Sequence, residues 1–341
     1  MRIDLPLTGT LAQAAGHAVE LAGVGADGAF AFEGPGEVFL PLAVAGAADT
    51  TLDLYPNVAI APPRSPMHLA YAAWELQRAT GGRFALGLGT QVRAHIERRF
   101  GMPWWPPVTR MRETVRALRA IFAAFQDGTP PAFEGRTTTH TLLPPTLAPS
   151  PLTTPSPPVW CAAVGPRMTR LAAAEADGLV VHPLASARTL REHTLAHLDA
   201  GLAEAGRHRD ELTVVANVLV ALHGEDEDPR PALDALRAIV GFYGSTPAYR
   251  VLLEVHGQDE LQPRLRELTR AGAWSELGDL VDDDLVRTFA VCAPPAAAAA
   301  EIVARVGGLV ERVALGVHHG GPALTAELVA ELRSRRSDPL R

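Results

Sequence analysis

Apolar and polar positions along the chain follow two different periods. Eight short segments rich in aliphatic and β-branched residues have the composition of strands: 2–5, 28–32, 52–60, 84–88, 159–163, 178–181, 212–222 and 312–316. Helical sequence follows each of them, most clearly over residues 109–125, where Met111, Val115 and Leu118 share one apolar face. Strands that alternate with helices pair in parallel, because a crossover helix returns the chain to the same end of the sheet. Eight such units predict an α/β fold, a (β/α)8 TIM barrel that forms a single domain over residues 1–341.

Two stretches interrupt the alternation. Residues 127–158 are rich in proline and predict a stiffened connection with room for one short hairpin, and residues 241–289 are rich in charge and predict an irregular insertion. Loops of this length are usually functional, so we expect both to cover a pocket at the barrel mouth. Its flat apolar walls would come from five aromatic side chains: Trp104, Trp105, Tyr243, Tyr249 and Trp274. Such walls favour an apolar or aromatic organic substrate.

The composition narrows the classes of function. All 31 basic residues are arginine, so no lysine is present for Schiff-base chemistry or for a phosphate-loop motif. A net charge of −7 without a basic stripe argues against a nucleic-acid partner. Cys161 and Cys292 are too few for a disulfide framework and lack the spacing of a zinc site. The sequence shows no signal-peptide pattern and no apolar run of membrane-spanning length, so we expect a cytoplasmic protein with no membrane partner.

Candidate chemistry lies where predicted strands end, because the loops after these ends build the site of a TIM barrel. The candidates are Glu33 after the second strand, Asn57 and Val58 in the third, Thr90 and Gln91 after the fourth, and Val164 and Gly165 after the fifth. The glycines before Thr90 would let a ligand approach the backbone closely. The turn at Gly165 and Pro166 opens a helix whose free N–H groups suit a phosphate. Each feature by itself is equally compatible with an ordinary turn or solvated loop.

The histidines and acidic runs give weaker signals. His193 and His197 have the spacing of a metal pair, but the segment lacks the glutamate of a zinc protease and lies away from the mouth, so we expect no metal site. His182, His318 and His319 follow predicted strands and could face the mouth, although simple polarity at the barrel end explains them better. The aspartates at 282–284 are typical of a solvated loop.

Taken together and in order, these motifs resemble the luciferase-like monooxygenase superfamily, and within it the branch of deazaflavin (coenzyme F420)-dependent oxidoreductases. The resemblance covers nearly the whole chain. The segments that carry it are Arg64-Ser65-Pro66, residues 81–90, residues 91–99, Gly165-Pro166-Arg167-Met168, Ala176-Asp177-Gly178 and residues 242–250.

The resemblance implies a deazaflavin or flavin lying across the carboxyl-terminal mouth of the barrel. A bulge with a non-prolyl cis peptide, matched by Asn57 and Val58, would support its ring, and Glu33 would lie beside the ring. Contacts to the ribityl chain and phosphate are matched by Thr90, Gln91 and His95, and the phosphate cradle by Val164, Gly165, Pro166, Arg167 and Met168. Glu33 and His95 are the candidate catalytic residues, and the acid or base itself is not identified. The superfamily commonly dimerises, so a homodimer is expected.

This chain departs from the sugar-phosphate dehydrogenases of the superfamily. Gly34 stands where they have a catalytic histidine, Val92 replaces their glutamate, and their substrate-binding lysines are absent. A sugar-phosphate substrate is therefore not expected. We predict hydride transfer between coenzyme F420 and a small organic substrate, with the deazaflavin's oligoglutamate tail near Arg93, Arg98, Arg99 and Arg167. One alternative is an FMN-dependent monooxygenase supplied with reduced flavin by a partner reductase, and a second is a non-catalytic flavin-binding barrel.

Overall fold

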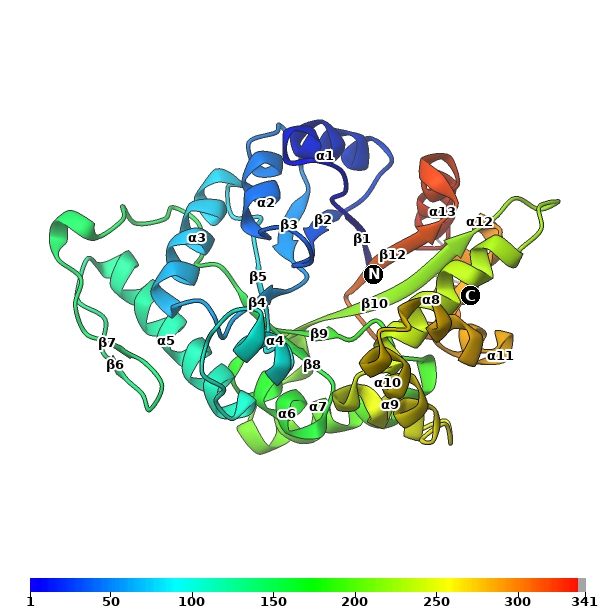
Figure 1. Cartoon of the computed structure of the whole chain (residues 1–341). Coiled ribbons are helices and arrows are strands. Elements are labelled where there is room, and N and C mark those ends of the chain that lie inside the picture. Colours follow the sequence, from blue (N-terminus) through cyan, green and yellow to red (C-terminus); the bar gives the residue numbers. More distant parts are fainter. Residues whose placement is uncertain (337–341) are drawn as a thin grey trace.

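A nearly closed barrel of parallel strands forms the centre of the molecule (Figure 1). The computed structural model describes residues 1–336. Its main sheet runs in the order β3-β2-β1-β12-β10-β9-β8-β5-β4, and its neighbouring strands pair in parallel. The Ala85 N–H donates to the Leu54 carbonyl at 3.0 Å, so the chain entering β5 also contacts β3 and brings the ring together. The predicted TIM-barrel fold is confirmed.

The strands coincide with the predicted segments except in two places. Their bounds are β1 Arg2–Pro6, β2 Gly28–Ala31, β3 Asp53–Pro56, β4 Ala59–Ile60, β5 Leu86–Gly89, β8 Val159–Ala163, β9 Gly178–Val181, β10 Thr213–Leu222, β11 Ala290–Ala293 and β12 Arg312–His319. The segment predicted as one strand over 52–60 is two strands, because the chain bulges at Asn57 and Val58, where the peptide bond is cis. The short strand β11, which pairs with the second half of β10, is not among the predicted elements.

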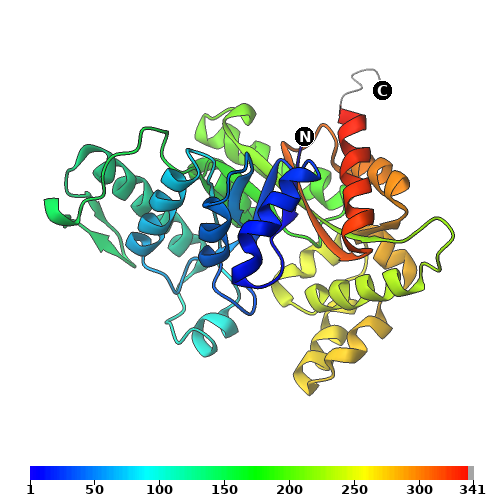
Figure 2. The ribbon, with the colours of Figure 1, turned by 90° about the horizontal axis from the view of Figure 1, so that it is seen from above.

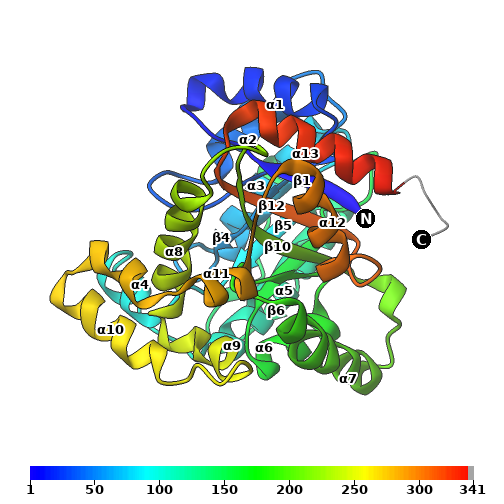
Figure 3. The same ribbon diagram turned by 90° about the vertical axis from the view of Figure 1, so that its right-hand side faces the viewer.

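Helices surround the barrel. They are α1 Ala14–Gly23, α2 Phe39–Gly46, α3 Pro66–Ala79, α4 Arg93–Arg98, α5 Pro107–Asp127, α6 Pro166–Glu175, α7 Ala196–Ala205, α8 Arg230–Gly244, α9 Arg250–Glu254, α10 Leu261–Ala271, α11 Asp283–Phe289, α12 Pro295–Val306 and α13 Gly321–Arg336. A π-helical segment, η3 (Thr189–Leu195), leads into α7. Figure 3 shows α12 and α13 near each other, and the two helices pack together. None of the helices in residues 1–336 combines the length and hydropathy that a membrane span requires.

The two insertions project from opposite sides of the barrel (Figures 1 and 2). The proline-rich connection contains the expected hairpin, β6 Phe133–Glu134 with β7 Thr139–His140, and the turn η2 Pro145–Leu147. It packs on α3, where Tyr71 Oη donates to the Leu147 carbonyl at 2.9 Å and Trp74 Nε1 to the Ser150 carbonyl at 3.1 Å. The expectation that this connection covers the pocket holds only at the side: Thr137 lines a small pocket described below, and no residue of 127–158 lines the main cavity.

The insertion over 241–289 is helical rather than irregular. It contains η5 Pro247–Tyr249, α9, α10, η6 Trp274–Leu280 and α11. The leucines that alternate with charges along α10 form a strong apolar face, and Leu261 and Leu265 are buried in a second core cluster with α8. The charge that suggested an irregular loop lies on the outer face of these helices.

The amino-terminal end of the barrel is closed by a buried ion pair. Arg312, at the start of β12, donates to both carboxylate oxygens of Asp4 at 2.7 and 2.6 Å and to Asp53 at 2.6 Å. Tyr55 Oη donates to the same Asp4 carboxylate at 2.7 Å. A Cβ on Gly28 would lie 2.6 Å from both the guanidinium and this carboxylate, so only glycine fits there. This end is therefore filled by structural contacts, which leaves the carboxyl end for a ligand.

Candidate active site

A cavity of about 510 Å³ opens at the carboxyl ends of the strands. Its volume falls in the range of ordinary ligand sites. The sequence-predicted residues that line it are Glu33, Asn57, Val58, Thr90, Gln91, Val164, Gly165, Pro166, Arg167 and Met168. They come from the ends of four different strands, β2, β3, β5 and β8, so the fold brings together positions that are up to 135 residues apart in sequence. Residues of the second insertion, Tyr243, Ala248 and Tyr249, form one side of the cavity.

The floor of the cavity is the bulge between β3 and β4. The peptide bond between Asn57 and Val58 is cis, as the resemblance implied. Asn57 Nδ2 donates to Asn217 Oδ1 at 2.6 Å, and Asn217 Nδ2 donates to the Val181 carbonyl at 2.8 Å, which ties the bulge to β9 and β10. Asn217 is absent from the predicted site, although a lone amide inside the β-branched segment 212–222 is a signal that could have identified it.

The glycines of β5 accommodate this bulge. A Cβ on Gly87 would lie 2.2 Å from the Pro56 carbonyl oxygen, and a Cβ on Gly89 would lie 2.6 Å from Val58 Cγ2. Real Cβ atoms do not approach other atoms so closely, so both positions require glycine. The expectation that these glycines serve the approach of a ligand therefore needs correction for Gly87, whose close neighbour is the backbone of the adjacent strand. Gly89 contacts the bulge and also lines the cavity.

Glu33 holds the backbone behind the bulge. Its side chain is 5% exposed and accepts hydrogen bonds from Arg64 Nη1 at 2.8 and 2.7 Å and from the Ile60 N–H at 2.6 Å. Burial lowers the pKa of Arg64, but the hydrogen bonds and charges of Glu33 and Glu37 outweigh burial and raise that pKa above its ordinary value. Glu33 is thus the ion-pair partner of Arg64 and also holds the backbone of Ile60. This geometry gives it a positioning role.

The amino terminus of α6 forms the far rim of the cavity. Gly165 is its N-cap and Pro166, which has no N–H, is its first residue. The N–H groups of Met168 and Thr169 donate to the Gly165 carbonyl at 3.1 Å, which leaves the N–H of Arg167 in the first turn free for a ligand. A Cβ on Gly165 would meet no atom within 4 Å, which leaves open space in front of this group. His193 Nε2 donates to the Val164 carbonyl at 3.2 Å and holds the loop in place. His193 therefore lies next to the mouth, which corrects the expectation that it lies away from it. Within residues 1–336 no three His, Cys, Asp or Glu side chains are placed so that they could hold a metal ion.

The exit of β5 forms the near rim. Thr90 and Gln91 line the cavity, and Gln91 has a left-handed backbone with φ 53° in which its own Oε1 accepts from the Val92 N–H at 2.9 Å. His95 does not lie among the lining residues. Ile96 is the buried residue of α4, which leaves His95 exposed on the outer side of this helix. Burial and the neighbouring Arg99 lower the pKa of His95.

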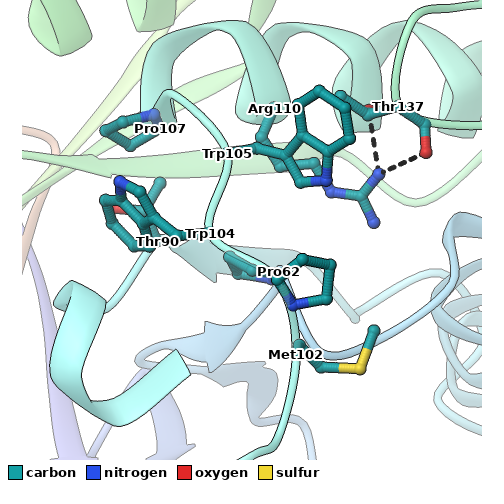
Figure 4. A pocket seen from close by; sticks show the side chains of 9 residues that line it. Pro62, Thr90, Met102, Trp104, Trp105, Pro107, Arg110 and Thr137 are labelled. Carbon is teal, nitrogen blue, oxygen red and sulfur yellow. Dashed lines mark hydrogen bonds between the residues drawn. The ribbon is translucent and has the colours of Figure 1, made fainter. Parts of the chain in front are cut away.

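A smaller pocket of about 140 Å³ adjoins the cavity and shares Thr90 and Pro107 with it. Figure 4 shows Trp104 beside Thr90, and Arg110 donating to the carbonyl and hydroxyl of Thr137. The predicted aromatic walls are therefore divided. Trp104 and Trp105 line this side pocket, Tyr243 and Tyr249 line the main cavity, and Trp274 is exposed and contacts only Phe242 among aromatic rings.

His182 is a further polar group that the fold places in the site. It follows β9, lines the cavity, and contacts the rings of Tyr243 and Tyr249 with centroid distances of 4.9 and 3.9 Å. Burial lowers its pKa to about 3, so the imidazole is neutral at ordinary pH. The sequence offered His182 only as a residue that could face the mouth.

A parallel barrel whose carboxyl-terminal mouth holds a cis-peptide floor and an open helix terminus defines a luciferase-like barrel. The chain belongs to the luciferase-like monooxygenase family, whose model matches residues 3–312. It is 44% identical over 313 residues to an uncharacterised protein of Mycobacterium tuberculosis, with 92% of each chain covered. It is 30% identical over 268 residues to the 5,10-methylenetetrahydromethanopterin reductase of Archaeoglobus fulgidus, covering 76% of this chain and 74% of the relative.

Two solved structures show how widely this fold is used. The coenzyme F420-dependent tetrahydromethanopterin reductase of Methanopyrus kandleri superposes with a TM-score of 0.77 at 23% identity over 96% of each chain. A type II Baeyer–Villiger monooxygenase of Pseudomonas putida, in complex with FMN, superposes with a TM-score of 0.64 at 16% identity over 97% of each chain. Both share the fold, and the relatives support an oxidoreductase.

Proposed function

We propose that this protein is a coenzyme F420-dependent oxidoreductase that transfers a hydride between the deazaflavin and a small organic substrate. The observation that carries the proposal is the amino terminus of α6, which faces the cavity with open space in front of Gly165. Unpaired N–H groups at a helix amino terminus attract a phosphate, and glycine lets the phosphate approach them. The reductase relative and the F420-dependent neighbour support the deazaflavin.

The residues present fit such a cofactor. When bound, deazaflavin supplies a hydride-carrying ring, and the protein supplies orientation, electrostatics and exclusion of water. The bulge at Asn57 and Val58 would support the ring, Thr90 and Gln91 would contact the ribityl chain, and Gly165 with Arg167 would hold the phosphate. The pair of Glu33 and Arg64 keeps the bulge in position. His95 lies outside this set.

Charge favours the deazaflavin over FMN. Both cofactors carry a tricyclic ring, a ribityl chain and a phosphate, but only F420 adds an oligoglutamate tail. Arg98 and Arg167 are exposed and form no ion pair with any residue in 1–336, so both are available for carboxylates. Arg93 and Arg99 are engaged, since Arg93 pairs with Glu97 and Arg99 donates to the Gly34 carbonyl at 2.6 Å. An FMN-dependent monooxygenase is the second candidate, favoured by the FMN-bound neighbour, and it would need reduced flavin from a partner enzyme.

Titration of the purified protein with each cofactor tests the choice. Ring fluorescence reports binding of F420 and of FMN under identical conditions. We expect at least tenfold tighter binding of F420, equivalent to about 1.4 kcal/mol. The single variant Arg98→Gln should lose much of that advantage while keeping its affinity for FMN, because Arg98 would contact only the tail, whereas Arg167 would also hold the phosphate that both cofactors share. Tenfold tighter binding of FMN would overturn the proposal and establish the monooxygenase alternative.

A further inference from the structure

Three polar groups on one wall of the cavity have no partner. They are Nε2 of His182 and the phenolic oxygens of Tyr243 and Tyr249, none of which makes a hydrogen bond to any residue in 1–336. His182 follows β9, Tyr243 lies on α8 and Tyr249 on η5, and both tyrosine rings contact the ring of His182. All three line the cavity. The convergence of three polar groups that are free to bond on one wall of a cavity points to a ligand that hydrogen-bonds with them.

The hydrogen-bonding character of this wall follows from the backbone around His182. Its Nδ1 accepts from the Leu184 N–H at 3.1 Å, so a neutral imidazole carries its proton on Nε2. Burial raises the pKa of Tyr243 to about 12, with a further contribution from Tyr249, and burial also raises the pKa of Tyr249. Both phenols therefore keep their protons. The wall presents three donors to the cavity.

The wall offers no counter-charge. The charged side chains that line the cavity are Glu33 and Arg167. Glu33 is already bonded to Arg64, and Arg167 lies at the rim on α6. A carboxylate or ammonium group placed against His182 would lose its hydration without gaining an ionic partner, which is strongly unfavourable. An uncharged acceptor gains hydrogen bonds without that penalty.

We propose that His182, Tyr243 and Tyr249 bind the reacting end of the substrate, and that this end is an uncharged oxygen function, a carbonyl group or the corresponding hydroxyl. The proposal rests on the function proposed above for the location of the hydride carrier, whereas the recognition of oxygen by this wall is independent of it. A site built from donors discriminates strongly against analogues that lack the oxygen, because its own polar groups then stay unpaired. The three side chains act as substrate-binding and specificity-determining residues.

The wall is held rigidly for this task. Gln262 is buried on α10, and its Nε2 donates to the Ser245 carbonyl at 2.9 Å. Ser245 Oγ donates to the Phe242 carbonyl at 2.7 Å, which fixes the corner between α8 and η5. Both tyrosines lie next to this corner. Binding of a substrate oxygen therefore requires little reordering of the wall.

Binding of three cyclohexane derivatives to the full-length protein tests the proposal. Cyclohexanone, cyclohexanecarboxylate and methylenecyclohexane differ only in the group offered to the wall. Affinity is measured by calorimetry with and without F420, and the nitrogen NMR signal of His182 Nε2 reports contact directly. We expect cyclohexanone to bind at least tenfold more tightly than the other two and to shift that signal.

Single variants locate the contact. His182→Phe keeps an aromatic ring against both tyrosines, and Tyr249→Phe removes only a hydroxyl. Each should weaken cyclohexanone about tenfold and leave methylenecyclohexane unchanged. Tyr71→Phe is the matched control, since its hydroxyl bonds to Leu147 outside the cavity, and it should bind cyclohexanone as the wild type does.

The outcomes separate this proposal from the proposed function. If the protein binds cyclohexanone selectively, in a way that depends on His182, but does not bind F420, the proposal for this wall is supported and the cofactor assignment is refuted. If the protein binds F420 but prefers cyclohexanecarboxylate, the proposal for this wall is wrong and the cofactor assignment stands. The same holds if it binds F420 and both variants bind cyclohexanone as tightly as the wild type does.

Discussion

The neutral state of His182 predicts a measurable loss of stability in mild acid. In the unfolded chain the imidazole titrates near 6.5, whereas burial lowers its pKa in the folded protein to about 3. Between these values the unfolded state binds a proton that the folded state does not. Stability contributed at this site is therefore complete above about pH 6.5 and is lost progressively as the pH falls toward the folded pKa.

The size of the effect follows from the difference between the two pKa values. At about pH 5 the medium lies roughly 1.5 units below the unfolded pKa, and each unit corresponds to about 1.4 kcal/mol, so His182 should lower the free energy of unfolding by about 2 kcal/mol. Burial also lowers the pKa of other histidines, among them His140, His256 and His318, and these add to the loss in the wild type. A variant that lacks only His182 isolates its share.

Urea unfolding at about pH 7.5 and at about pH 5, for the wild type and for His182→Gln, measures this share. The substitution changes the contacts with Tyr243 and Tyr249 at both pH values, so these contacts cancel in the comparison between the two. The variant should lose about 2 kcal/mol less than the wild type on acidification. An equal loss in both proteins would show that His182 is protonated normally, and the reasoning about its donor state would fail.

Two further predictions concern the frame around the site. Gly87→Ala places a Cβ 2.2 Å from the Pro56 carbonyl oxygen and should lower the free energy of unfolding by about 1–3 kcal/mol. The control Gly36→Ala, whose Cβ meets nothing within 4 Å, should stay within about 0.5 kcal/mol of wild type. Equal urea midpoints for the two variants would contradict the close packing of β5 on the bulge. Arg312→Leu removes the ionic partner of the fully buried Asp4 and should lower the free energy of unfolding by about 3–5 kcal/mol. The double variant Asp4→Leu/Arg312→Leu should recover much of this loss. A double variant that unfolds as easily as the single one would refute this account.

Local patterns were sufficient to predict the barrel. Each strand of the predicted set is a short apolar segment next to a helix with an apolar face, and such periodicity depends on neighbours in sequence. Residue composition predicted one continuous strand over 52–60. The break at Asn57 and Val58 could not be predicted in this way, because it depends on Gly87 and Gly89 of another strand, which make room for the bulge. Strand β11 has only four residues and is defined by its pairing with β10, which no local pattern reveals.

The sequence predicted the location of the site residues better than it predicted their roles. Strand ends identified Asn57, Thr90 and Gly165, because all carboxyl ends of a parallel barrel meet at one mouth. The partner of Glu33 could not be read from sequence, since Arg64 reaches it from 31 residues away and makes it a support of the bulge. His95 was misplaced, because the face that α4 turns to the core depends on the packing of Ile96.

The central claim, that a phosphate-bearing deazaflavin binds across this mouth at the amino terminus of α6, is tested most directly by the F420 affinity of Gly165→Leu. The backbone of Gly165 has φ −86°, which any residue adopts, and its Cβ position is open, so the substitution should leave unfolding of the cofactor-free protein nearly unchanged. The leucine side chain would occupy the space in front of the helix terminus and should weaken F420 at least tenfold. Gly16→Leu, an equally open position on α1 outside the cavity, should bind as the wild type does. Wild-type affinity for F420 in Gly165→Leu would contradict the account.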